Sequence, residues 1–189
     1  MSTIVLLVVV AAVVLWVIGS YNGLIALKNQ VLNGWKQIDV QLKRRHDLIP
    51  NLVNTVKGAM DFERSTLEAV ISARNKAVSA SGVKETARAE GELTQALGRL
   101  FALTEAYPEL KSNQNVLQLQ EELTSTENKV GFARQFYNDI ATKFNIARET
   151  FPSNIVASSF GFTRAELFEI TEPGERAVPK VDLSMRRDA

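Results

Sequence analysis

The sequence contains no cysteine and a single histidine, His46. The missing cysteines exclude disulfide scaffolds, cysteine-ligated zinc, iron–sulfur clusters and thiol catalysis. One histidine excludes a metal site built from several histidines and disfavours a catalytic triad with a histidine base. The sequence also lacks a glycine-rich phosphate loop and the Gly-x-Ser-x-Gly elbow of serine hydrolases. We therefore predict no catalytic residue, no metal, no cofactor and no small-molecule substrate.

The chain also lacks a strong charge of either sign. It has 22 basic and 21 acidic residues, which leaves a net charge of +1. Nucleic-acid-binding domains carry a clear basic excess, so this balance predicts that the protein does not bind nucleic acid.

What the chain does contain is one long apolar run at its start. Residues 1–27 include no charged side chain, and Ile4 to Ile18 is unbroken Val, Leu, Ile, Ala and Trp. About 20 such residues cross a ~30 Å hydrocarbon core as a helix. Trp16 and Tyr21 suit the interface between lipid and water. This run therefore predicts contact with a lipid bilayer.

Three interpretations of the run are open: a cleaved signal peptide, a buried core helix and a single-pass anchor. A signal peptide has a basic region before its apolar part, and Met1 to Thr3 has none, although residues 17–19 would permit cleavage. A core helix would bury an unusually uniform apolar surface in a small protein. The sequence therefore favours the anchor.

Flanking charges predict the orientation of this anchor. Five basic residues follow the run: Lys28, Lys36, Lys43, Arg44 and Arg45. Asp39 is the one acidic residue in the same interval. Basic residues near the end of a span stay in the cytoplasm. We therefore expect an inner-membrane protein with its N-terminus outside and its body in the cytoplasm.

Prolines and glycines that interrupt helices divide the body into helical stretches. Pro50 is expected to start a second helix, because proline fits the first turn and disrupts an interior. Boundaries are also expected near Gly82, Pro108 and Pro152. The predicted helices cover the anchor to about residue 42, then about 50–80, 83–107 and 116–151.

The last of these helices has the most regular pattern. Apolar residues recur at steps of three and four from Val116 to Phe151, with Thr126 as the one polar member. This heptad pattern is typical of helices that pack knobs into holes, as in a coiled coil. The residues of this core stripe that we single out are Leu119, Leu123, Val130, Tyr137, Ile140 and Phe144.

The predicted fold class is therefore all-α, an N-terminal transmembrane helix followed by an antiparallel four-helix-type bundle. We expect an anchor at 1–27, a bundle domain at 28–170 and a flexible tail at 171–189. The uncharged stretch from Phe151 to Phe162 should fold back on the bundle. The spacing of Thr163 to Glu166 is that of a capping box and indicates a short helix.

Two groups of residues are candidates for interaction. Apolar residues beside the stripes, Trp35, Phe132 and Phe136, leave room for contact with a second copy of the chain. Arg44 and Arg45, next to His46 and Asp47, either contact a partner or lipid headgroups, or complement the dipole of a helix that ends before Pro50. Other charged residues are candidates for ion pairs between helices: Glu63, Arg74, Glu127, Lys129 and Arg134.

Several strings in the chain resemble the LemA family in order and in sequence. They are residues 44–53, 107–110, 127–138, 144–145, 151–154 and 160–162. The resemblance covers the chain from the anchor to about Glu169. It implies a bacterial single-pass membrane protein with a helical bundle and no established catalytic residues. A relative in magnetosome-forming bacteria looks like a membrane-shaping factor, which suggests a membrane-organising role.

Two functions fit these observations. The first is a homo-oligomeric scaffold that organises membrane or membrane proteins. The alternative is a monomeric adaptor that docks a signalling protein or a membrane protease.

Overall fold

The computed structural model describes residues 1–58 and 63–169, and within these residues the chain forms helices and no strand. Six helices follow in order: α1 (Ser2–Lys57), α2 (Arg64–Ser79), α3 (Val83–Thr104), α4 (Pro108–Lys111), α5 (Gln114–Glu149) and α6 (Ser153–Ser159). The predicted all-α class is confirmed. The expected tail at 171–189 lies outside the described residues.

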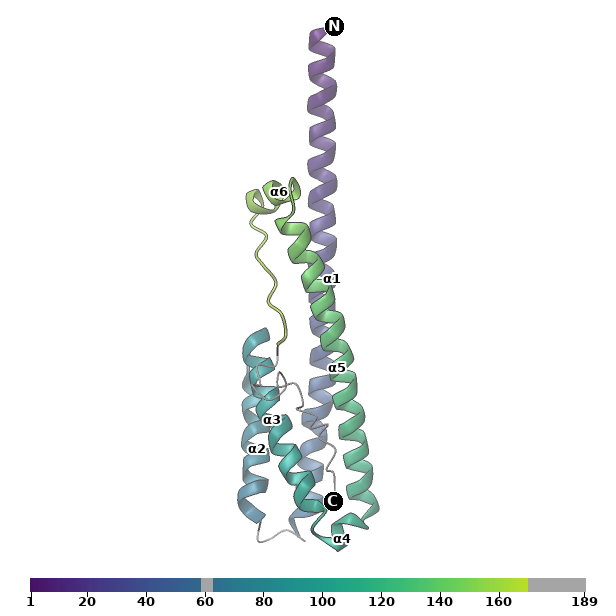
Figure 1. Cartoon of the computed structure of the whole chain (residues 1–189), viewed down its shortest axis with the longest axis vertical. Coiled ribbons are helices and arrows are strands. Elements are labelled where there is room, and N and C mark those ends of the chain that lie inside the picture. Colours follow the sequence, from purple (N-terminus) through teal and green to yellow (C-terminus); the bar gives the residue numbers. More distant parts are fainter. Residues whose placement is uncertain (59–62, 170–189) are drawn as a thin grey trace, which may run out of the picture.

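Helix α1 joins the apolar run to the body without a break. Its 56 residues are about 84 Å long at ~1.5 Å per residue. An 18-residue stretch of α1 is hydrophobic enough to cross a membrane, and none of that stretch is buried in the protein. The interpretation as a buried core helix is therefore wrong. Figure 1 shows the N-terminal end of α1 standing clear of the other helices, as far as α6.

The prediction that a second helix starts at Pro50 is wrong, because Pro50 lies inside α1. A proline inside a helix cannot donate to the carbonyl four residues earlier, which here belongs to His46. That carbonyl accepts a hydrogen bond from Arg74 Nε at 3.3 Å instead. A side chain of α2 thus supplies the donor that the backbone lacks, and α1 continues for seven more residues.

The body is built from two antiparallel pairs of helices. Helices α1 and α5 lie side by side over most of the body, and α2 and α3 form a hairpin against its lower half (Figure 1). Gly34 lies where α1 and α5 approach each other, and a Cβ there would be in van der Waals contact with the Cα of Tyr137, at 3.4 Å. One core cluster lies between the hairpin and the two long helices, and a second lies between α1, α5 and α6.

Helix α5 carries the predicted stripe on its buried side. Leu123, Val130, Tyr137, Ile140 and Phe144 are buried, and Leu119 is partly buried against the core cluster that contains Leu123. The helix begins after Asn113, whose side chain accepts hydrogen bonds from the backbone N–H of Asn115 and Val116. It ends at Glu149, so Phe151 is not part of the helical stripe and is 75% exposed.

The chain after α5 turns back along the bundle. The uncharged stretch folds back as expected, but it does so by forming α6 at Ser153–Ser159. The predicted helix at Thr163 is wrong, since residues 162–169 have no helical structure. Gly161 makes the turn before them with φ of +68°, a conformation that favours glycine.

Asparagines on α5 hold residues 162–169, which we call the returning segment. The side chain of Asn145 bonds both the N–H and the C=O of Ala165, each at 2.9 Å. Asn138 does the same for Phe168, at 2.8 and 3.1 Å. Seven helical residues span about 10.5 Å and three extended residues about 10 Å, so the two spacings match. The backbone of this segment is therefore satisfied by side chains rather than by a helix.

Candidate functional site

The densest polar cluster in the described part of the chain is buried between α1, α3 and α5. Arg45 Nη1 lies 2.9 Å from Glu90 Oε2, and Arg45 Nη2 donates to Thr94 Oγ1 at 2.8 Å. His46 Nε2 lies 2.6 Å from the other oxygen of Glu90. Glu127 Oε2 lies 2.9 Å from Arg45 Nη2. One guanidinium thus faces two carboxylates and a hydroxyl from two other helices.

Two charged members of this cluster are buried. Arg45 is 3% exposed and Glu90 is 2% exposed, so neither charge reaches water freely. A buried charge needs a partner and further hydrogen bonds to offset its lost hydration, and each of these two has both. The cluster therefore connects α1 to α3 through buried polar contacts, and to α5 through Glu127.

A small cavity adjoins the cluster. Its volume is about 160 Å³, and its walls include Arg45, Glu90, Glu127, Arg134 and Phe168. Ligand pockets for small molecules usually measure about 300–1,000 Å³. The His46–Glu90 pair has the composition of a general base. Glu90 is 2% exposed, whereas His46 also lines a second cavity, of about 410 Å³, together with Asp47 and Arg74.

The structure separates the two arginines that the sequence places together. Arg44 is exposed, whereas Arg45 points into the cluster. Neither lies at a helix C-terminus, because α1 extends to Lys57, so the interpretation that they complement a helix dipole is wrong. Arg45 is also unavailable to lipid headgroups or to a partner surface in this fold. Among the residues that we expected in ion pairs between helices, Glu127 contacts Arg45, which was not one of them.

Trp35 packs against the core and stays partly exposed. Its ring lies against Tyr137 and Phe168, with ring centres 5.7 and 6.1 Å apart. Tyr137 donates from its hydroxyl to the carbonyl of Glu166 at 2.8 Å. Burial, followed by the negative charge of Glu166, raises the pKa of Tyr137 above its ordinary value.

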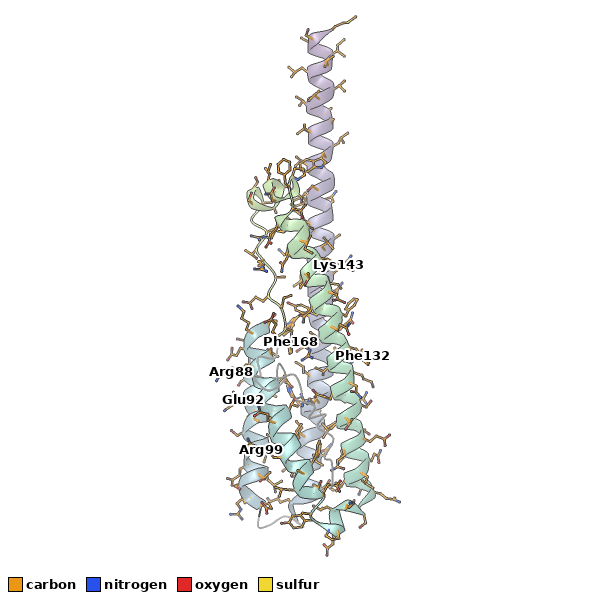
Figure 2. The ribbon with its side chains drawn as sticks, in the orientation of Figure 1. Arg88, Glu92, Arg99, Phe132, Lys143 and Phe168 are labelled. Atoms are coloured by element: carbon orange, nitrogen blue, oxygen red, sulfur yellow. The ribbon has the colours of Figure 1, made fainter. Side chains whose placement is uncertain are left out.

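Phe132 and Phe136 are exposed as expected. They are 73% and 46% exposed, and Val40 on the neighbouring helix is 62% exposed. These three residues line one groove between α1 and α5, and Lys36 and Lys129 border it. Figure 2 places Phe132 across the molecule from Arg88 and Glu92 of α3. We call this surface the α1–α5 face.

Sequence reasoning missed Glu90, Asn138 and Asn145 as structural residues. Glu90 continues the spacing of Leu93, Leu97 and Leu100 backwards along α3, so an extended heptad count would have placed it in the core. The two asparagines follow Tyr137 and Phe144 directly on α5. Their seven-residue separation was the available signal.

Comparisons with known proteins identify relatives of this chain by sequence. The chain is 29% identical to protein LemA of Metamycoplasma hominis, with 82% of this chain and 71% of the relative covered. It is 25% identical to magnetosome protein MamQ 2 of Paramagnetospirillum magneticum, with 84% of this chain and 68% of the relative covered. For magnetosome protein MamQ of Magnetospirillum gryphiswaldense the identity is 23%, with the same coverage.

The names of these relatives denote no enzymatic activity. The model of the LemA family matches residues 34–183, which cover most of the body and the returning segment. With that match, the chain belongs to the LemA family.

Proposed function

We propose that this membrane protein is a non-enzymatic scaffold that self-associates through the α1–α5 face and thereby organises the membrane around it. The exposure of Phe132, Phe136 and Val40 carries this proposal. Large apolar side chains that gather on one surface, rather than being scattered singly, are typical of interaction sites. The face also runs along the two longest helices of the protein.

The membrane anchor supports self-association. Copies held in one bilayer share a thin layer of solution, which raises their local concentration and populates weak contacts. Every copy presents the α1–α5 face at the same distance from its anchor, because α1 forms both. Contacts between copies would therefore form at one level above the membrane.

The charges around the face favour a head-to-tail contact. Lys36 and Lys129 border the groove, and a two-fold contact would bring these lysines of one copy toward those of another. Like charges across an interface disfavour binding. A contact between the α1–α5 face and a different surface of the next copy avoids this repulsion. Such contacts give a ring if the rotation closes and an open array if it does not.

We further infer a single-pass topology in the bacterial inner membrane, with the N-terminus outside and the bundle in the cytoplasm. The support is the uncharged run followed by Lys28 and Lys36. Relatives named as magnetosome proteins are consistent with association with a membrane.

The test is the mass of the full-length protein in nanodiscs or mild detergent over a range of concentrations. We expect oligomers for the natural chain and a shift to monomers for Phe132→Ser/Phe136→Ser. The matched control is Ile71→Ser, which removes an apolar side chain that is 43% exposed on α2, outside the α1–α5 face. A natural chain that stays monomeric at every concentration would contradict the scaffold and favour the monomeric adaptor.

A further inference from the structure

The segment that contains α6 exposes apolar side chains and carries no charge between Glu149 and Arg164, which lie 3.8 Å apart. Residues 150–163 include no Asp, Glu, Lys or Arg. Val156, Ala157 and Phe162 are buried against the protein, whereas Phe151 is 75%, Ile155 55% and Phe160 57% exposed. The segment thus has an apolar inner side and an apolar outer side, which is unusual for a surface that faces only water.

The position of α6 along α1 is fixed by aromatic contacts. The ring of Tyr21 packs on Phe160 and on Phe162, with ring centres 4.8 and 5.7 Å apart. Leu24 of α1 belongs to the same core cluster as Val156 and Ala157 of α6. In Figure 1, α6 lies beside α1 at the end of the body from which the free part of α1 emerges.

The exposed and uncharged residues at the start of the chain indicate where the membrane surface falls. Residues 1–16 are all exposed, and Val17 is the first residue with partial burial. The uncharged run continues to Leu27. A hydrocarbon core of ~30 Å takes about 20 residues of such a run, so a span that ends near Tyr21, at the level of α6, lies wholly within uncharged sequence.

The first charged residue of α1 lies just beyond this level. Lys28 lies one to two turns beyond Tyr21, and its Nζ is 6.0 Å from the centre of the Phe162 ring. Lysine near the end of a span extends its ammonium group toward the headgroups while its stem stays among apolar groups. The apolar outer side of α6 thus lies between the hydrocarbon region and the first cation.

We propose that α6 and its flanking turns form a second membrane contact, with Phe151, Ile155 and Phe160 inserted at the boundary between headgroups and acyl chains. The occupant of this surface is the lipid bilayer itself. Because the segment carries no charge, the contact depends on apolar insertion and does not require anionic lipid. Two contacts, α1 and α6, would hold the long bundle at a fixed inclination to the membrane.

This inference rests on insertion of α1 in the membrane but not on self-association. It is testable because the natural chain has no cysteine. A nitroxide label is attached at Ile155→Cys, and separately at Phe151→Cys, in full-length protein placed at one copy per phosphatidylcholine nanodisc. Collisions with oxygen, which enters lipid, are compared with collisions with a water-soluble nickel chelate.

Labels at two further positions give the reference collision rates for lipid and for water. Val10→Cys reports the membrane interior and Phe132→Cys, at 73% exposure on the body, reports water. We expect labels at 155 and 151 to lose nickel collisions relative to 132 and to approach the oxygen collisions seen at 10. Nickel access at 155 and 151 equal to that at 132, with the label at 10 protected, would overturn the proposal while leaving the anchor intact.

Protection of 155 and 151 from both agents would also overturn it, because it would place the residues against protein rather than lipid. Circular dichroism of each labelled variant is compared with that of the natural chain. Agreement at both positions guards against a local disturbance from one substitution.

Discussion

Arg74 of α2 donates from Nε to the carbonyl of His46, at 3.3 Å, and this is the carbonyl that Pro50 leaves without its backbone donor. The contact explains how α1 passes through a proline. A buried carbonyl without a partner costs free energy comparable to a lost hydrogen bond. The arginine therefore has a specific task that depends on a residue in another helix.

This dependence predicts coupling between the two positions. Arg74→Met should lower the free energy of unfolding by about 1–3 kcal/mol in the natural chain, because the carbonyl loses its donor. In a Pro50→Ala background the backbone N–H returns, so the same substitution should cost less. Denaturant unfolding of the four proteins in detergent measures the coupling. Equal costs in both backgrounds would show that Arg74 does not serve this carbonyl.

The buried pair of Arg45 and Glu90 should be far more important than exposed pairs on the same helix. Glu90→Ala leaves a buried guanidinium short of a partner, and removal of one partner of a buried pair costs about 3–5 kcal/mol. Glu92 pairs with Lys76 and Arg88 at 3.2 and 3.4 Å on the surface, so Glu92→Ala should cost less than about 1 kcal/mol. Unfolding midpoints of the two variants in detergent provide the comparison. Similar losses for both would contradict the assigned role of the cluster.

Sequence patterns predicted the elements where a single physical rule decides the outcome. The uncharged run at 1–27 specifies a long apolar helix, and the heptad stripe of α5 specifies which side is buried. Sequence patterns failed where a residue far away in the sequence changes the local rule. Pro50 alone indicates a helix boundary, and only Arg74, 24 residues later, makes a continuous helix acceptable.

Contacts from residues far away in the sequence also explain why the predictions for the returning segment and for the candidate site failed. Thr163 and Glu166 have the spacing of a capping box, yet side chains of α5 bond the backbone of Ala165 and Phe168 and replace the helical hydrogen bonds. Arg44 and Arg45 look alike in sequence, but adjacent helical positions point in different directions. Only the packing of α3 and α5 shows that Arg45 is the buried one.

Asn145 offers a direct test of the returning segment. Asn145→Ala removes two hydrogen bonds to Ala165 and leaves its polar groups without these partners, which should cost about 1–3 kcal/mol. The amide of residue 165 should also exchange its hydrogen faster. Gln135→Ala, at an exposed position on the same helix, is the control and should change neither quantity. If the amide hydrogen of residue 165 exchanges at the same rate in Asn145→Ala as in the natural chain, Asn145 does not hold the returning segment.

Tyr137 makes stability depend on pH in the alkaline range. Burial, and then the charge of Glu166, raises its pKa in the folded protein, whereas the unfolded chain keeps the ordinary value of about 10. The folded state therefore retains the phenol proton longer. The stabilisation is complete below about pH 10 and is lost as the pH rises toward the higher folded value. The difference between phenolate titrations of the natural chain and Tyr137→Phe isolates this group. A difference curve centred at the ordinary pKa would refute the prediction.

The orientation in the membrane can be decided with one reagent. Ser112 is exposed in the turn after α4, at the end of the bundle farthest from the anchor (Figure 1), and no natural cysteine competes with a new one. Because Lys28 and Lys36 follow the apolar run, the body should remain in the cytoplasm. A thiol reagent that cannot cross membranes should label Ser112→Cys only after the cells are permeabilised, and should label Ser2→Cys in intact cells. Labelling of Ser112→Cys in intact cells would place the bundle outside. Labelling there together with loss of Ser2 from the mature chain would identify the apolar run as a cleaved signal peptide.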